Sequence, residues 1–499
     1  MVKEKIGSAS DIQVGSCTIG GCTAAADNGP LKLVDETLRD GTQSLWGMMI
    51  SYHMFEPVLR EISEVGYDQL NLPHHPGQPT VSARFFKEDP RLLYKLWRDK
   101  LKDSKTIIST VSMGMSLEVA GPAENKTMVS MYYRQCKEWL PQLQRYMLMC
   151  CTEDEIKNTF PVLFPMFRSL GIEPIPYMAI GHSPRHNEEF YTSRVKHIVE
   201  KYKPISICIK DVDGLLVAER IRKLVPAMQA AADGTPLEIH MHGMNGEQSY
   251  NAVVAMELGI RKITTCIPPL AYGSSHVSVY NVVKNAEQMG IPHNIDLEKV
   301  KVIEDRLRRI AKAYGHPVDV QPLPFDLQTY KHQVPGGVIS NTTTQLAQLG
   351  LQDKLQDVLE EIPLILKELG YPIMITPFSQ FIVTQAVLNV QLGRWVQCID
   401  ALVEFAAGIY GIEESGVNHM DQNLKDKLLS LPPAKRIQKI ADNLVANINS
   451  EPSEAECKKR FGLPPDADLE TWALRVVMKG DEDLKNVTPG GPESYRKYL

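Results

Sequence analysis

The chain lacks the features that mark secreted, membrane and nucleic-acid-binding proteins. Its first thirty residues have no charged start followed by an apolar run, and no later stretch reaches ~18 uninterrupted apolar residues. Nine cysteines are scattered without the spacing of a disulfide framework or a zinc finger. A formal net charge of −6 gives no cationic field for phosphate backbones or anionic lipid. We therefore expect a cytoplasmic protein that neither binds nucleic acid nor inserts into a membrane.

What the sequence does contain is a regular alternation of short apolar runs with longer amphipathic stretches, from residue 31 to about residue 290. This alternation is typical of repeated βα units on a parallel sheet. Eight units favour a closed (β/α)8 barrel, the TIM barrel. The eight runs are LKLVDETL, YDQLNLP, TIISTVSM, RYMLMCC, EPIPYMAIG, ISICIKD, LEIHMHG and ITTCIP.

After residue 290 the pattern changes to long helical periods such as KVIEDRLRRIAKAYG and DKLQDVLEEIPLILKELG, with no strand pattern between them. A second, mainly helical domain is therefore expected, interrupted by the turn-like segments YKHQVPGGVISN and MITPFSQ. The expected organisation is an N-terminal arm or tail at 1–30, the barrel at 31–295, the helical domain at 296–480 and a C-terminal tail at 481–499.

Unusual polar residues close three of the barrel strands, at the end where barrel active sites lie. Asp40 follows the first strand, and His240 and His242 are two apart on the seventh, so that both can face one site. Two imidazoles and a carboxylate suit a divalent transition metal, although an H-x-H pair alone is often merely solvated or structural. Lys210 closes the sixth strand. It is either half of a salt bridge with a neighbouring aspartate, Asp211 or Asp213, or a neutral amine that reacts with CO2 to form a carbamate ligand.

Together these segments carry a family resemblance. LVDETLRDGTQS, CIKDVDGLL, the H-x-H strand end, YKHQVPGGVISN and ITPFSQFIVTQAVLNV follow one another as in the carboxyltransferase domains of pyruvate carboxylase, oxaloacetate decarboxylase α subunit and transcarboxylase. The resemblance runs from about residue 31 to about residue 470 and implies a barrel followed by a helical domain. It assigns the metal to Asp40, carbamylated Lys210, His240 and His242.

The resemblance also implies roles for residues beside the metal. Thr376 matches the hydroxyl that shuttles a proton between substrate and biotin, and with Ser379 it is expected to contact biotin. Arg39 and Gln43 match polar groups beside the substrate oxygen. Thr376 has a purely structural alternative as a helix N-cap, because Thr-Pro suits a helix start.

The implied activity is carboxyl transfer between carboxybiotin and an enolisable carbonyl compound, with zinc, manganese or cobalt as the metal. The biotin-acceptor pattern, a lysine between two methionines, has only VVMKGDED at Lys479 as a partial match. We therefore expect biotin to arrive on a separate carrier protein, with a biotin carboxylase subunit as a further partner and with the chain forming a homodimer or higher homo-oligomer.

The substrate end of the site departs from the family pattern. Members acting on pyruvate carry an arginine at the end of the third strand, whereas residues 107–118 here contain no basic residue, and the family's Asp after H-x-H is Gly243. Without a cation, a substrate carboxylate loses several kcal/mol of binding. The pattern thus favours an acceptor other than pyruvate or oxaloacetate. The pocket residues considered, including possible replacement cations, are Ser109, His74, His75 and Arg185.

Two other functions share part of the pattern. Aldol and Claisen enzymes of the hydroxymethylglutaryl-CoA lyase and isopropylmalate synthase type share the LRDG and H-x-H strands, but they do not require Lys210 or the ITPFSQ and PGGVISN segments. A non-catalytic scaffold subunit of a biotin-dependent complex is the third hypothesis. Retention of every expected metal ligand is evidence against it.

Overall fold

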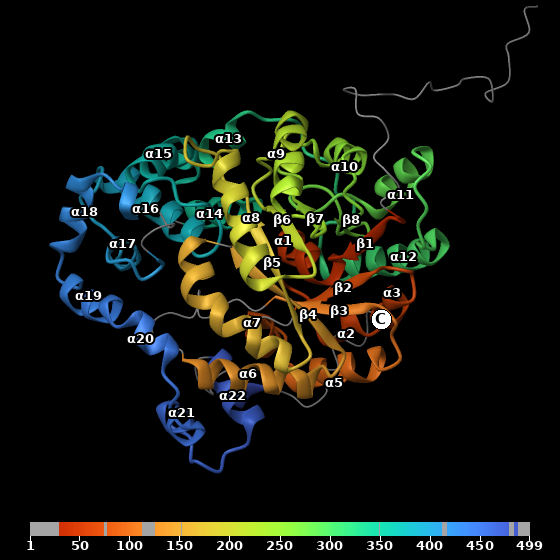
Figure 1. Cartoon of the computed structure of the whole chain (residues 1–499), viewed down its shortest axis with the longest axis horizontal. Coiled ribbons are helices and arrows are strands. Elements are labelled where there is room, and N and C mark those ends of the chain that lie inside the picture. Colours follow the sequence, from red (N-terminus) through yellow and green to blue (C-terminus); the bar gives the residue numbers. More distant parts are fainter. Residues whose placement is uncertain are drawn as a thin grey trace, which may run out of the picture.

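A computed structural model of the chain describes residues 29–73, 77–111, 125–150, 152–348, 350–411, 417–478 and 484–487. Eight parallel strands close into a barrel in the order β1 to β8 (Figure 1), and this confirms the expected TIM barrel with its surrounding helices. The strands are β1 (Lys32–Asp35), β2 (Gln69–Leu72), β3 (Ile107–Thr110), β4 (Leu143–Cys150), β5 (Glu173–Ala179), β6 (Ile207–Asp211), β7 (Leu237–Met241) and β8 (Lys262–Thr265).

Each strand is followed by helical structure, most of which covers the outside of the barrel. These segments are a π-helical turn η2 (Thr37–Gly41), α1 (Thr42–Trp46), α2 (Tyr52–Phe55), α3 (Leu59–Ser63), α4 (Gly77–Phe85), α5 (Pro90–Leu101), α6 (Lys126–Trp139), η3 (Glu155–Thr159), α7 (Phe160–Ser169), α8 (Glu188–Tyr202), α9 (Ala218–Ala231), α10 (Gln248–Glu257) and α11 (Val279–Gln288). Their apolar faces and the outward-facing strand residues form one continuous core.

The rest of the chain is helical. Its helices are α12 (Leu297–Tyr314), α13 (Gln328–His332), α14 (Gly336–Gln348), α15 (Leu355–Glu368), α16 (Phe378–Leu392), α17 (Asp400–Ala406), α18 (Gln422–Leu429), α19 (Ala434–Asp442), α20 (Leu444–Asn449), α21 (Glu454–Arg460) and α22 (Leu469–Val477), with short 3-10 turns at Gln352–Lys354, Val417–His419 and Leu484–Asn486. No helix of the described residues is both long and apolar enough to cross a bilayer.

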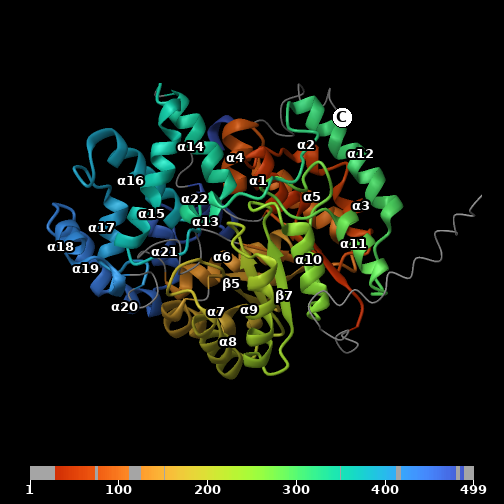
Figure 2. The ribbon, with the colours of Figure 1, turned by 90° about the horizontal axis from the view of Figure 1, so that it is seen from above.

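Two apolar cores divide these helices. A core of its own joins residues from Val334 to Ile437, which include buried side chains of α14 to α19; Figure 2 shows these helices gathered on one side of the barrel. By contrast, Val300, Ile303 and Leu307 of α12 belong to the barrel core. The chain's last helices return to that core as well, because α21 and α22 pack on α6 (Figure 1).

The packing of α22 against the barrel helices depends on one buried aromatic residue. Trp472 is fully buried and belongs to the barrel core. In the same helix, Glu470 accepts a hydrogen bond of 2.7 Å from Trp139 Nε1 of α6. The helix is therefore anchored by both a large apolar side chain and a polar contact.

We expect Trp472→Ala to lower the free energy of unfolding by about 3–5 kcal/mol, because it leaves a cavity where a large aromatic side chain was packed. Urea denaturation measures the change. Val302→Ala on α12 is the control, since Val302 is 50% exposed and its truncation removes little buried surface. Equal stability of the two variants would show that α22 is not held on the barrel in this way.

Candidate metal centre and active site

The first part of the site is formed by the turn that follows β1. Glu36 ends the strand region, and its side chain accepts a hydrogen bond from the backbone N–H of Asp40. The π-helical turn that contains Asp40 directs its side chain into the barrel mouth. Gly41 leaves little room for a side chain, because a Cβ there would lie 3.1 Å from the backbone oxygen of Leu270.

A buried charge network holds this turn. Arg39 Nε lies 2.7 Å from one oxygen of Glu36, and its NH1 lies 3.2 Å from Asp40 Oδ2. Asn71 donates a hydrogen bond of 2.5 Å to the other oxygen of Glu36. Burial alone would raise the pKa of the Asp40 carboxyl, but the charge of Arg39 is the largest of the opposing influences, which together hold that pKa well below its ordinary value. Asp40 is therefore an anion in a nearly dry site.

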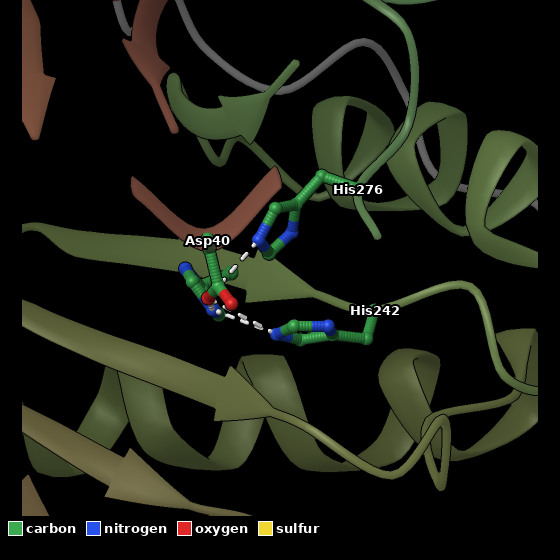
Figure 3. A group of neighbouring side chains, drawn as sticks. Asp40, His242 and His276 are labelled. Carbon is green, nitrogen blue, oxygen red and sulfur yellow. Dashed lines mark hydrogen bonds and ion pairs between the residues drawn. The ribbon is translucent and has the colours of Figure 1, made fainter. Parts of the chain in front are cut away.

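Three imidazoles surround the Asp40 carboxylate. Oδ2 of Asp40 lies 3.2 Å from Nε2 of His240, 3.2 Å from Nε2 of His242 and 3.3 Å from Nε2 of His276. Figure 3 shows His242 and His276 pointing at Asp40 from two directions. His240 and His242 come from β7 and the residue after it, as the sequence predicts, whereas His276 comes from the loop after β8.

This donor set fits a divalent transition metal. One candidate ligand atom from each of the four residues lies within 4.8 Å of the others. Around an ion with ligand distances of ~2.1 Å, neighbouring ligand atoms lie roughly 3.0–3.5 Å apart. The three distances from Asp40 to the imidazoles and the 3.3 Å between Nε2 of His240 and Nε2 of His242 fall in that range. Burial lowers the pKa of both His240 and His276, which keeps these two imidazoles neutral and able to donate a lone pair. Imidazole and carboxylate are donors that zinc, manganese and cobalt accept.

Lys210 lies at the edge of this cluster. Its Nζ is 3.2 Å from Nε2 of His240 and 5.6 Å from the centre of the Tyr177 ring. Burial, and then the charge of Arg39, lowers its pKa. Asp211 instead accepts backbone hydrogen bonds from Leu215 and Leu216, at 2.8 and 2.9 Å. Among the described residues, Lys210 forms no salt bridge with Asp211 or Asp213, so the salt-bridge interpretation finds no support.

A cavity of about 350 Å³ opens beside the cluster, between the barrel mouth and the helical part. Thr376 precedes α16, and its Oγ1 lies 3.5 Å from Nε2 of Gln380. Within the described chain it makes no capping hydrogen bond to α16, whose N-cap is Pro377. Residues from both parts line the cavity, among them Arg39, Gln43, Val111, Met149, Lys210 and Thr376.

Other residues singled out from the sequence lie away from the cavity. Ser109 is buried on β3, and Val111, two residues further on, is the one that lines the cavity. The guanidinium of Arg185 donates to the backbone oxygen of Gly370. Ser379 is fully buried and does not line the cavity. His74 and His75 lie outside the described residues.

His276 is the residue that the sequence analysis missed. It lies in the segment GSSHVS after the eighth strand, without a second histidine beside it to suggest chelation. The available signal was its position, because the loop after the last strand opens at the same barrel end as Asp40 and the H-x-H pair.

Comparison with known proteins agrees with this arrangement. Residues 329–475 match the family model described as the conserved carboxylase domain. The chain is 27% identical over 401 residues to a pyruvate carboxylase subunit of Methanocaldococcus jannaschii, covering 78% of this chain and 67% of that protein. It is 26% identical over 454 residues to the 2-oxoglutarate carboxylase large subunit of Hydrogenobacter thermophilus, covering 90% and 67%. The chain is thus similar to carboxylase subunits over most of its length and matches the conserved carboxylase domain in its helical part.

A solved structure of a carboxyltransferase domain has the same fold. The carboxyl transferase domain of Rhizobium etli pyruvate carboxylase, solved with pyruvate and biocytin, superimposes with a TM-score of 0.76 at 18% identity. The match covers 90% of this chain and 76% of that one. The expected combination of a barrel with a helical part is thus the architecture of a known carboxyltransferase domain.

The buried pair of Glu36 and Arg39 should matter strongly for stability. We expect Glu36→Gln to lower the free energy of unfolding by about 3–5 kcal/mol, because the Arg39 charge stays buried after losing its closest partner. The double variant Glu36→Gln/Arg39→Met should recover only part of this loss, since it removes both charges of the pair but also takes from Asp40 the guanidinium that lies 3.2 Å away. Chemical denaturation of the single and double variants measures both changes.

Glu64→Gln is the control, because Glu64 pairs with Arg60 on the surface, where the Arg60 side chain is 69% exposed. It should leave the free energy of unfolding almost unchanged. A Glu36 variant as stable as the Glu64 variant would contradict the role assigned to the buried pair.

Proposed function

We propose that the chain transfers a carboxyl group between carboxybiotin on a separate carrier protein and an enolisable carbonyl compound. The observation that supports this most is the shared cavity. It brings Asp40, Lys210 and His242, from the barrel, together with Thr376, from the helical part. An aldol-type lyase would not require Thr376 or the helical segment that carries it, and no feature of the cavity favours that alternative.

The ligand cluster suits a metal with a Lewis-acid role. A divalent ion held by Asp40, His240 and His242 would polarise the acceptor carbonyl and lower the free energy of its enolate by several kcal/mol. As the resemblance implies, carbamylated Lys210 would add an oxygen donor. The choice among zinc, manganese and cobalt, the carbamate, the biotin carboxylase partner and the homo-oligomer remain predictions.

The chain's own residues supply orientation and proton transfer. Arg39 is held rigidly by Glu36 and Asp40, so it presents a fixed positive charge at the cavity wall where oxygen charge develops. Gln43 offers an amide beside it. Thr376 Oγ1 can both accept and donate a proton, so it can pass the acceptor's proton to the ureido nitrogen of biotin.

The apolar side of the cavity, formed by Val111 and Met149, favours a substrate with a neutral or apolar end. Arg39, whose guanidinium also lines the cavity, already pairs with two carboxylates. Both relatives described above carry a keto acid in their names, pyruvate and 2-oxoglutarate. Our proposal for this chain is instead a neutral ketone or an acyl thioester.

We expect Thr376→Ala to slow carboxyl transfer by about a hundredfold or more, because the proton relay is lost. Transfer is followed with a carboxylated biotin carrier protein and a panel of ketones, keto acids and acyl thioesters. Thr376→Ser keeps the hydroxyl and should keep most of the rate. Melting temperature and metal content should not change in either variant. Normal turnover by the alanine variant with a competent acceptor would exclude the relay, and failure of the wild-type protein across the panel would contradict the proposed function.

We expect pyruvate and oxaloacetate to be carboxylated or decarboxylated at least about thirtyfold less efficiently than a neutral ketone or acyl thioester. The reason is that a carboxylate against this wall loses a charge-assisted pair of ~2–5 kcal/mol. Val111→Arg should shift the preference towards pyruvate, whereas Val111→Met changes size without adding charge and should not. Efficient use of pyruvate by the unmodified protein would contradict the prediction and restore the family's usual acceptor.

A further inference from the structure

The hydrogen bonding of His276 decides which of its two ring nitrogens faces the carboxylate and imidazoles of Asp40, His240 and His242. Nδ1 lies 2.9 Å from the backbone oxygen of Met241, which can only accept a hydrogen bond. Nδ1 therefore carries the hydrogen, and Nε2 is left with a lone pair. His242 is fixed in the same way, because its Nδ1 lies 2.8 Å from the backbone oxygen of Ser274. Both side chains thus turn an acceptor nitrogen towards Asp40.

Such an arrangement is unfavourable without a cation. Nε2 of His276 is buried, has no hydrogen-bond partner among the described residues and lies 3.3 Å from a carboxylate oxygen that can only accept. The ring of His276 is also 4.3 Å from the ring of His240 and 4.3 Å from that of His242, so there is no space for it to turn to water. A lone pair facing an anion in a buried site is stabilised when a cation lies between them.

The backbone sets this position of His276 independently of any ion. His242 and His276 form an antiparallel bridge, and Gly243 N–H donates a hydrogen bond of 2.9 Å to the backbone oxygen of Ser275. A Cβ on Gly243 would lie 2.5 Å from the backbone oxygen of Gly273, so a side chain at position 243 would push the two loops apart. The glycine that replaces the family's aspartate after H-x-H therefore allows His276 to reach the site.

Lys210 occupies a different place from His276. Its Nζ lies 3.2 Å from Nε2 of His240, and it forms no ion pair with Asp40 among the described residues. His276, by contrast, faces Asp40 directly and packs against both other imidazoles. Asp40, His240, His242 and His276 already form a four-donor set without Lys210.

We propose that His276 is a fourth protein ligand of the metal and that the site holds its ion whether or not Lys210 is carbamylated. The proposal rests on the proposed function only for the presence of a metal. Its consequence is that metal retention does not require CO2, because a carbamate on Lys210 would only add a donor to an ion that Asp40 and the three histidines already hold.

The test compares His276→Gln, which removes the imidazole, with Lys210→Met, which removes the amine. His186→Gln is the matched control, because His186 is buried but bonds Ser183 away from the cluster. Cobalt(II) affinity and the visible absorption of the cobalt protein are measured in CO2-free buffer and with added bicarbonate. We expect His276→Gln to bind cobalt at least about tenfold more weakly with an altered spectrum. Lys210→Met and the control should stay within about twofold of wild type in both buffers.

Retained affinity and an unchanged spectrum in His276→Gln would overturn the proposal, as would loss of cobalt by Lys210→Met or an affinity that requires bicarbonate. If His276→Gln fails to fold, X-ray absorption at the metal edge of the wild-type protein decides. Three imidazole ligands support the proposal, and two contradict it. Neither measurement uses biotin or an acceptor. Wild-type protein that holds metal through His276 but transfers no carboxyl group would therefore contradict the proposed function alone.

Discussion

One carboxylate oxygen, Oδ2 of Asp40, faces three imidazole nitrogens and one guanidinium within 3.3 Å. Keeping this anion in a nearly dry site is the constraint on which the arrangement of the barrel mouth depends. A charge removed from water must find compensating charge and hydrogen bonds nearby. Arg39 provides part of that compensation, and Glu36 in turn neutralises Arg39. The remaining compensation is what a bound cation would supply.

The same constraint explains why the loops after β7 and β8 approach so closely. His242 and His276 reach Asp40 from different loops, and their Nδ1 atoms are both held by backbone oxygens. Gly243 lies where these loops touch, because a Cβ there would lie 2.5 Å from the backbone oxygen of Gly273. Backbone geometry therefore orients the nitrogen donors, which limits the reorganisation needed when an ion binds.

The barrel alone does not complete the site. Pro335, Gly336 and Thr376, from the helical part, close one side of the cavity beside the ligand cluster. That part has its own apolar core, while α12 before it and α21 and α22 after it belong to the barrel core. The segment that carries Thr376 is thus connected at both of its ends to helices packed on the barrel, which favours a stable position of Thr376 relative to Asp40.

The sequence by itself determined the strands and helices of the barrel and three of the four residues in the candidate ligand cluster. Strand and helix periods are local signals, so all eight strands could be located, and Asp40, His240 and His242 follow from strand ends and a spacing of two residues. Only the tertiary structure showed that His276 belongs to the ligand cluster and that Val111, rather than Ser109, lines the cavity. The reason is that a loop has no period to reveal where its side chains point. Which residue reaches a site also depends on how closely two loops approach, here through Gly243 and Gly273. That contact is made between residues distant in sequence, and it exists only once the barrel has closed.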